Sequence, residues 1–239
     1  MNFSELSRIK TIIFSALSQM KGIKKSRIQF MAHIFTLFLG IKGRLNFLQF
    51  ERYGKYVEQT YRNRFEERFP FLDFNKAMVQ QRASDHLAIA FDPSYISKSG
   101  KQTPGTGYFW SGVAGRAKWG LEIGGLAAVD IDNHTAFHLE AVQTIGLKEG
   151  ETLLEYYTRI ILARKQTLQG LSKVLVADAY FSKRTFVAPL QENGFTVISR
   201  LRDDADLQYL YTGEQKQGRG RPRKYDGKVN VKRAEAGQG

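Results

Sequence analysis

The chain has 239 residues, no cysteine, 36 Lys and Arg against 23 Asp and Glu, and a formal net charge of +13. Because cysteine is absent, a disulfide framework and a zinc site built from thiolates are both excluded. Its 42% hydrophobic residues exclude a disordered chain and suffice for one large domain or two small ones. The positive excess favours a polyanionic partner, with ordinary solubility charge as the alternative.

The most apolar stretch is too short to cross a bilayer. It covers residues 30–41, about a dozen, whereas a membrane span needs roughly 20. A buried helix is expected there, and no membrane partner. The apolar run after Lys10 is short, is followed by further lysines and lacks a small-residue cleavage site, so it does not indicate a signal peptide. These features predict a cytoplasmic protein.

Residues 1–82 are predicted to form a helical region. Apolar side chains recur there at intervals of three and four residues, on one helical face: Ile9, Ile12, Ile13, Leu17 and Met20. The first 50 residues contain eight Lys and Arg and one acid, Glu5. A DNA-binding helix-turn-helix and a plain helical bundle with a solvated face both fit this pattern.

Residues 83–212 are predicted to form an α/β core. Short apolar strands are expected at 87–91, ending at Asp92-Pro93, and at 173–177 and 195–199. Two antiparallel strands, 119–129 and 134–142, are expected to join at a polar corner. Helices are expected at 149–168 and 182–193, the second capped by Ser182. This order predicts a mixed sheet with helices packed on it.

Two of these strands end in an aspartate. Asp92 follows Leu-Ala-Ile-Ala-Phe, and Asp178 follows Val-Leu-Val-Ala. If the two strands are neighbours, the carboxylates converge, and a hard divalent cation such as Mg²⁺ would relieve their repulsion. Such a site can support phosphodiester cleavage with two metal ions. A single strand-terminal Asp is more often a turn or helix cap, but two in one basic chain favour a functional pair.

The last segment, residues 213–239, is rich in Gly, Pro and basic residues, and Gly218, Gly220 and Pro222 argue against a helix. A flexible solvated segment is one interpretation. Because its charge has the same sign as that of the whole chain, contact with a phosphate backbone is preferred.

Three stretches together resemble bacterial insertion-sequence transposases of the DDE type. They are Val174-Leu-Val-Ala-Asp178-Ala-Tyr-Phe-Ser-Lys183, the run from Gly194 through Arg200 to Ala205, and Gly218-Arg-Gly-Arg-Pro-Arg-Lys-Tyr-Asp-Gly-Lys228. Ala90-Phe-Asp-Pro-Ser-Tyr-Ile96 and Gly107-Tyr-Phe-Trp110 match the region around that family's first aspartate. The resemblance covers roughly residues 85–228.

The resemblance implies a ribonuclease H-like mixed sheet flanked by helices and preceded by the helical region. It also implies an Asp-Asp-Glu triad that holds Mg²⁺ or Mn²⁺, with Asp92 as the first acid and Asp178 as the second. The implied function is DNA transposition in the bacterial cytoplasm, at the nucleoid, by a homodimer acting on element ends and target DNA. By charge and placement, seven residues are expected to contact DNA: Lys98, Arg200, Arg202, Arg219, Arg221, Arg223 and Lys224.

The sequence departs from this family at the third acid. In the family a Glu follows the basic stretch within a Tyr-x-x-Arg-x-x-x-Glu-x-x-x-x-x-x-Lys pattern, and the pattern does not occur here. We therefore expect a truncated transposase with little or no strand-transfer activity alone, because one acidic group of the metal site is missing. The alternatives are a catalytically inactive DNA-binding remnant and a general nuclease of the same fold.

Overall fold

The computed structural model describes residues 3–100, 102–201, 205–215 and 220–229. The chain separates into two compact units, Met1–Ser199 and Arg200–Gly239. The predicted contacts of Arg202 and Arg219 with DNA concern residues outside the described part of the chain.

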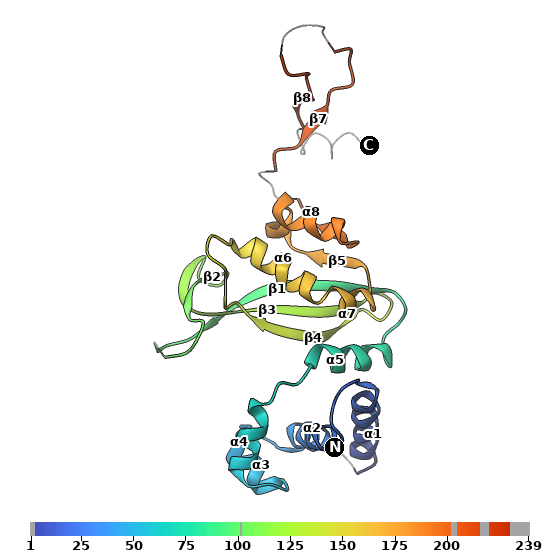
Figure 1. Cartoon of the computed structure of the whole chain (residues 1–239), viewed down its shortest axis with the longest axis vertical. Coiled ribbons are helices and arrows are strands. Elements are labelled where there is room, and N and C mark those ends of the chain that lie inside the picture. The colour runs from blue at the N-terminus through green and yellow to red at the C-terminus, as the bar shows by residue number, and fades with distance from the viewer. Residues whose placement is uncertain (1–2, 101, 202–204, 216–219, 230–239) are drawn as a thin grey trace. The chain divides into compact units, whose positions relative to one another are not determined.

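The first unit begins with the predicted helical region (Figure 1). Its helices are α1 (Phe3–Gln19), α2 (Lys25–Gly40), α3 (Phe47–Tyr53), α4 (Glu58–Glu66) and α5 (Phe71–Gln80). The apolar face of α1 is buried at Ile13, Leu17 and Met20, as the periodicity predicts. The apolar stretch 30–41 lies mostly in α2, which buries one side in this small core. None of the helices in the described ranges has both the length and the apolar character that a membrane crossing requires.

A mixed sheet follows the helices, as the sequence predicts. Its strands are β1 (Leu87–Ser97), β2 (Gly107–Ser111), β3 (Arg116–Asp130), β4 (Thr135–Gln143), β5 (Val174–Ala177) and β6 (Thr196–Ser199). The strand order is β2-β3-β1-β5-β6, with β4 also paired to β3. The pairs that involve β3 are antiparallel, whereas β1 with β5 and β5 with β6 are parallel. Each parallel connection passes through helices, which brings distant strands side by side.

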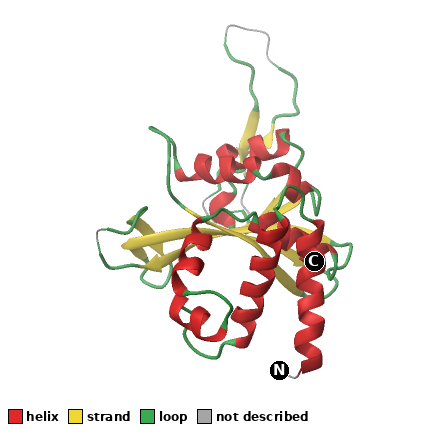
Figure 2. Ribbon diagram, turned by 60° about the horizontal axis from the view of Figure 1, so that its bottom comes forward, coloured by secondary structure: helices red, strands yellow, loops and turns green. Residues whose placement is uncertain are grey.

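Helices cover both faces of this sheet (Figures 1 and 2). The helices α6 (Leu153–Ala163), α7 (Lys165–Gln169) and α8 (Arg184–Glu192) lie in the connections between parallel strands. The core contains apolar residues of β1, β3 and β5, such as Ile89, Leu126 and Leu175, together with residues of α6 and α8. A mixed sheet flanked by helices therefore holds the ends of β1 and β5 rigidly.

The predicted polar corner between β3 and β4 is present. Asp130 is fully buried there, and its carboxylate accepts hydrogen bonds from the amide and hydroxyl of Ser84 and from Asn133. These donors hold the pKa of Asp130 well below its ordinary range, Asn133 contributing most. The corner is thus fixed by a charged cap rather than by apolar packing.

The predicted end of the first strand was wrong. β1 does not stop at Pro93 but continues to Ser97, paired with β3 throughout. On its other side the register with β5 ends at Ala90 and Val176. Beyond that point no described strand pairs with this edge of β1. Proline has no N–H to donate, and an unpaired edge tolerates its absence.

Two helix boundaries also differ from the prediction. The helix expected at 149–168 is two helices, because the chain leaves helical geometry at Arg164, whose guanidinium pairs with Glu140 on β4. Ser182 does not cap the next helix, since its hydroxyl donates to the carbonyl of Ala179 at 2.8 Å. α8 begins at Arg184 instead. The first difference involves a contact with a distant strand, and the second a hydrogen bond within the preceding turn.

The second unit contains an antiparallel pair, β7 (Gln208–Leu210) and β8 (Tyr225–Lys228). The guanidinium of Arg223 lies over the ring of Tyr211, 4.8 Å from its centroid, and pairs with Asp226 at 2.7 Å. The sequence predicted no helix in this segment and missed the strand pair.

Candidate functional site

Asp92 lies on β1, and Asp178 directly follows β5, the parallel neighbour of β1. β1 and β5 pair in the register Ile89 with Leu175 and Ala90 with Val176, an offset of 86 residues. The same offset, continued two residues further, relates Asp92 to Asp178. Because side chains two residues apart lie on the same face of a strand, both carboxylates leave the sheet on one side. The structure thus brings together the two acids that the sequence singled out.

The charge of Asp178 acts on Asp92. The pKa of Asp92 is raised, first by partial burial and then by the negative charge of Asp178. Both effects disfavour the ionised form, and no ion pair to either aspartate is present among the described residues. A pair of this kind is stabilised when a cation lies between its members.

Asp178 also caps a helix, which is the alternative role expected of an Asp at the end of a strand. Its Oδ1 accepts a hydrogen bond from the amide of Tyr180 at 3.0 Å and caps the short 3₁₀ helix η1 (Ala179–Phe181). Its carbonyl accepts one from the hydroxyl of Ser199, on β6, at 2.7 Å. The cap occupies one carboxylate oxygen and fixes its direction, which leaves Oδ2 for another ligand.

A third carboxyl, which the sequence analysis did not single out, acts on Tyr180 together with Asp178. Glu122 on β3 is only 6% exposed, and its Oε1 accepts hydrogen bonds from the hydroxyls of Thr144, at 2.8 Å, and Tyr157. Burial and the bond to Glu122 raise the pKa of Tyr157 strongly. Tyr180 feels both acids, since its pKa is raised by burial, then by Glu122 and then by Asp178. Because β1 and β3 pair Tyr95 with Glu122 and Asp92 with Gly125, the side chains of Glu122 and Asp92 lie on opposite faces of the sheet.

Glu122 could have been found from alternation in its strand. The neighbouring even-numbered positions of β3, Gly120, Gly124 and Leu126, are all buried, and Glu122 shares their face. An acid at such a position in an alternating pattern predicts an inward carboxyl that needs partners. Its partners, from β4 and α6, could not be identified from the sequence.

The two aspartates suit a divalent cation. Magnesium keeps several waters and is commonly held by one or two carboxylates together with phosphate oxygens of a substrate. Asp92 and Oδ2 of Asp178 supply such ligands. Within the described residues, however, no group of three His, Asp or Glu side chains is arranged to hold a metal ion. Glu122, whose Oε1 accepts two protein donors, does not complete a triad.

Among the described DNA-binding candidates, Lys98 belongs to the same unit as the aspartates, whereas Arg200, Arg221, Arg223 and Lys224 belong to the second unit. Lys98 is exposed, but it lies six residues beyond Asp92, roughly 20 Å along an extended strand. Arg200 directly follows β6 and begins the second unit. In that unit Arg221 and Lys224 are exposed, whereas Arg223 is engaged by Tyr211 and Asp226.

Comparison with known protein families gave no match, and comparison with curated proteins gave none either.

Proposed function

We propose that the chain binds DNA and cleaves and joins phosphodiesters with a divalent metal, as a DDE-type transposase or part of one. The observation that carries this proposal is the matched placement of Asp92 on β1 and of Asp178 directly after β5, the parallel neighbour of β1. The motifs around both aspartates, which resemble those of insertion-sequence transposases, support it. The mixed sheet with helices on both faces is compatible with a ribonuclease H-like fold.

In this chemistry the main contribution of the protein is to hold and orient the metal ion. Bound Mg²⁺ or Mn²⁺ would activate the attacking water or hydroxyl and stabilise the leaving oxygen. Asp92 and Asp178 would hold the ion, and the cap on Oδ1 of Asp178 would keep that carboxylate in one orientation. The raised pKa of Asp92 makes an empty pair unfavourable in its fully ionised form, so ion binding gains from relieving the repulsion.

The second candidate is a protein that binds DNA without cutting it. It is favoured by the finding that, in the part of the chain the structure describes, no third acid joins the pair. Binding would then rest on the positive charge alone. It would weaken steeply with salt and would respond neither to magnesium nor to substitution of the aspartates.

A cleavage assay separates the two candidates. The purified chain is mixed with a duplex that carries the terminal sequences of its own element, with and without Mg²⁺, and compared with Asp92→Asn and Asp178→Asn. We expect each substitution to reduce metal-dependent cleavage by about 10²-fold or more, because each removes an acid that holds the ion. Asp85→Asn, at the exposed start of the same strand, is the matched control and should keep the activity.

Cleavage that survives both substitutions would reject the assignment of these aspartates. Absence of cleavage in the unaltered chain, with salt-sensitive binding intact, would favour the second candidate. Direct titration with Mn²⁺, followed by electron paramagnetic resonance, shows separately whether the pair binds a metal.

A further inference from the structure

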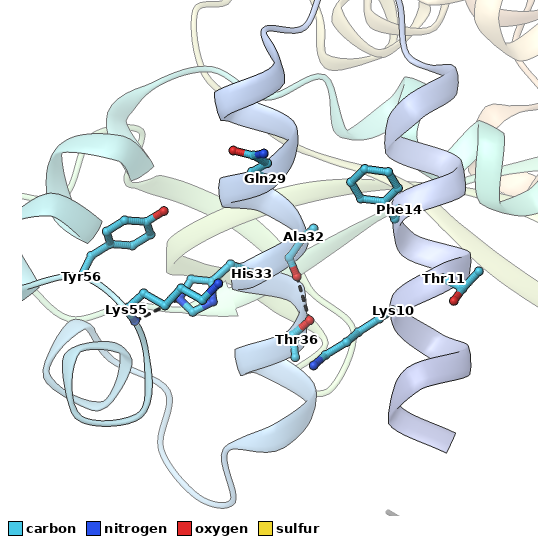
Figure 3. A pocket seen from close by; sticks show the side chains of 9 residues that line it. All are labelled: Lys10, Thr11, Phe14, Gln29, Ala32, His33, Thr36, Lys55 and Tyr56. Carbon is cyan, nitrogen blue, oxygen red and sulfur yellow. Dashed lines mark hydrogen bonds between the residues drawn. The ribbon is translucent and has the colours of Figure 1, made fainter. Parts of the chain in front are cut away.

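A pocket of about 740 Å³ lies in the helical region, away from the aspartates (Figure 3). It is bordered by α1, by α2 and by the segment between α3 and α4. Its lining residues are Lys10, Thr11, Phe14, Gln29, Ala32, His33, Thr36, Lys55 and Tyr56. The lining contains two lysines and a histidine but no acid.

The lysines of this pocket have no carboxylate partner among the described residues. Lys10 comes from α1 and Lys55 from the segment before α4, so two separate elements bring positive charge to one hollow. Neither lysine takes part in an ion pair of the described chain. An anion entering the pocket would therefore not have to displace a protein carboxylate.

His33 is held in a form that can donate a hydrogen bond. The hydroxyl oxygen of Tyr61 accepts from the amides of Lys55, at 3.1 Å, and Tyr56, at 3.4 Å, so its own proton is free for Nε2 of His33, 2.8 Å away. The amide of Lys55 also points at Nε2, at 3.4 Å. Since Nε2 accepts, the neutral ring carries its proton on Nδ1. Nδ1 has no hydrogen-bond partner among the described residues.

The threonine hydroxyls in the lining are already used as donors. Thr36 donates to the carbonyl of Ala32 at 2.8 Å, and Thr11 donates to that of Ser7 at 3.1 Å. The donors left over among the lining side chains are the two ammonium groups, the hydroxyl of Tyr56, the amide of Gln29 and Nδ1–H of His33. This set matches a ligand that offers several acceptor oxygens and negative charge.

We propose that this pocket binds a phosphate group, supplied either by the backbone of a nucleic acid or by a free nucleotide. The two ammonium groups and Nδ1–H of His33 would contact the phosphate oxygens. The pocket is larger than a phosphate needs, and Phe14, half exposed at its rim, offers an apolar face to an attached sugar or base. The site lies outside the aspartate pair, so its test needs no cleavage.

His33 supplies a direct readout. Burial lowers its pKa first, and the charges of Lys55 and then Lys10 lower it further. The other titratable groups that face it are Tyr56 and Tyr61, whose rings pack against the imidazole. A bound phosphate would offset the two lysine charges and raise the pKa of His33. Binding should therefore tighten as the pH falls through that pKa, because the complex takes up a proton.

The test uses the full chain carrying Asp92→Asn, which excludes cleavage, and follows the imidazole signal of His33 by NMR; a His33→Gln variant assigns that signal. The probes are inorganic phosphate, a deoxynucleoside monophosphate, a short DNA duplex, and acetate at equal ionic strength. We expect the phosphate probes to raise the pKa of His33 and acetate to leave it unchanged. Removing one lysine, by Lys10→Ala or Lys55→Ala, should weaken binding about tenfold. Lys42→Ala, exposed and outside the pocket, is the matched control.

A response to the duplex at concentrations where the monophosphate gives none identifies nucleic acid as the source, and the reverse order identifies a free nucleotide. The proposal is overturned if no phosphate probe moves the His33 signal, if acetate moves it equally, or if both lysine variants bind like the unaltered chain. Absence of cleavage in the assay with element-end DNA would concern the aspartates alone and would not affect the proposal that the pocket binds phosphate.

Discussion

At the residue scale, the charged groups around the sheet differ in how they are compensated. Asp130 is buried and fully hydrogen-bonded, and its pKa lies low. Asp92 has no such donors, and its pKa is raised by burial and by Asp178. An acid that lacks hydrogen-bond donors and lies near another negative charge lowers the stability of the fold. Such destabilising groups are typical of functional sites.

Asp92→Asn is predicted to stabilise the metal-free protein at neutral pH. A folded-state pKa above the ordinary value means that the folded chain binds more protons, so stability falls as the pH rises between the two values. Thermal unfolding should therefore show a higher midpoint for the variant at pH 7 and equal midpoints at a pH well below the ordinary pKa of Asp. Adding Mg²⁺ should raise the midpoint of the unaltered chain only. An equal magnesium response in both would contradict the role given to Asp92.

Tyr157→Phe is predicted to destabilise the fold by about 1–3 kcal/mol, because buried Glu122 loses one of its two donors. Tyr180→Phe is the control. The hydroxyl of Tyr180 makes no hydrogen bond in the described structure, and its ring is 39% exposed, so the change should stay within about 0.5 kcal/mol. Urea unfolding of both variants measures the difference; equal losses would mean that the Glu122 network contributes little.

At the scale of elements, the pairing of β1 with β3 places the aspartate. The two strands stay in register from Leu87 with Asp130 to Ser97 with Gly120. At the far end they approach closely, since a Cβ on Gly120 would lie 2.4 Å from the carbonyl oxygen of Ile96. The carbonyl belongs to the backbone and cannot rotate away, so this position requires glycine.

Gly120→Ala is predicted to cost about 1–3 kcal/mol, because the strands must separate to admit the methyl group. Gly125→Ala, on the same strand and opposite Asp92, is the matched control. Its Cβ would lie 3.5 Å from the nearest atom, the carbonyl oxygen of Asp92, which is an ordinary contact. Chemical denaturation should therefore rank Gly120→Ala well below Gly125→Ala. The reverse order would argue against the observed register at the end of β1.

At the scale of the whole chain, the net charge of +13 is distributed between parts with different structural demands. In the helical region the charge lines a pocket, whereas in the second unit it lies on an exposed strand pair. Arg223 helps to hold that pair together, so only its neighbours Arg221 and Lys224 are well suited to test contact with phosphates.

The logarithm of the association constant of the full chain for DNA is predicted to fall linearly with the logarithm of the salt concentration, because phosphates bound by the protein release their counterions. The double variant Arg221→Ala/Lys224→Ala should reduce the magnitude of the slope by about 2 if both residues contact phosphates. Lys148→Ala/Lys173→Ala removes the same charge from exposed positions of the first unit. Fluorescence anisotropy across a salt series gives both slopes; indistinguishable slopes would remove the second unit from the interface.

Much of the fold could be predicted because local patterns report burial. Apolar spacing gave the helical region and the strands, and the turn residues gave the corner at Asp130. Two of the errors lie where a distant contact overrides the local pattern. Arg164 breaks a periodic helix by pairing with Glu140, and β1 continues through Pro93 because β3 remains beside it.

The sequence by itself determined that two apolar runs are each followed directly by an aspartate, that the chain begins with helices and that its net charge is +13. Only the tertiary structure decided that those strands are parallel neighbours, that Glu122 and Asp178 both act on Tyr180 and that Lys10, His33 and Lys55 line one pocket. The reason is physical: periodicity records which side of an element faces the core, but the choice of neighbours depends on pairing and packing between segments far apart in the chain.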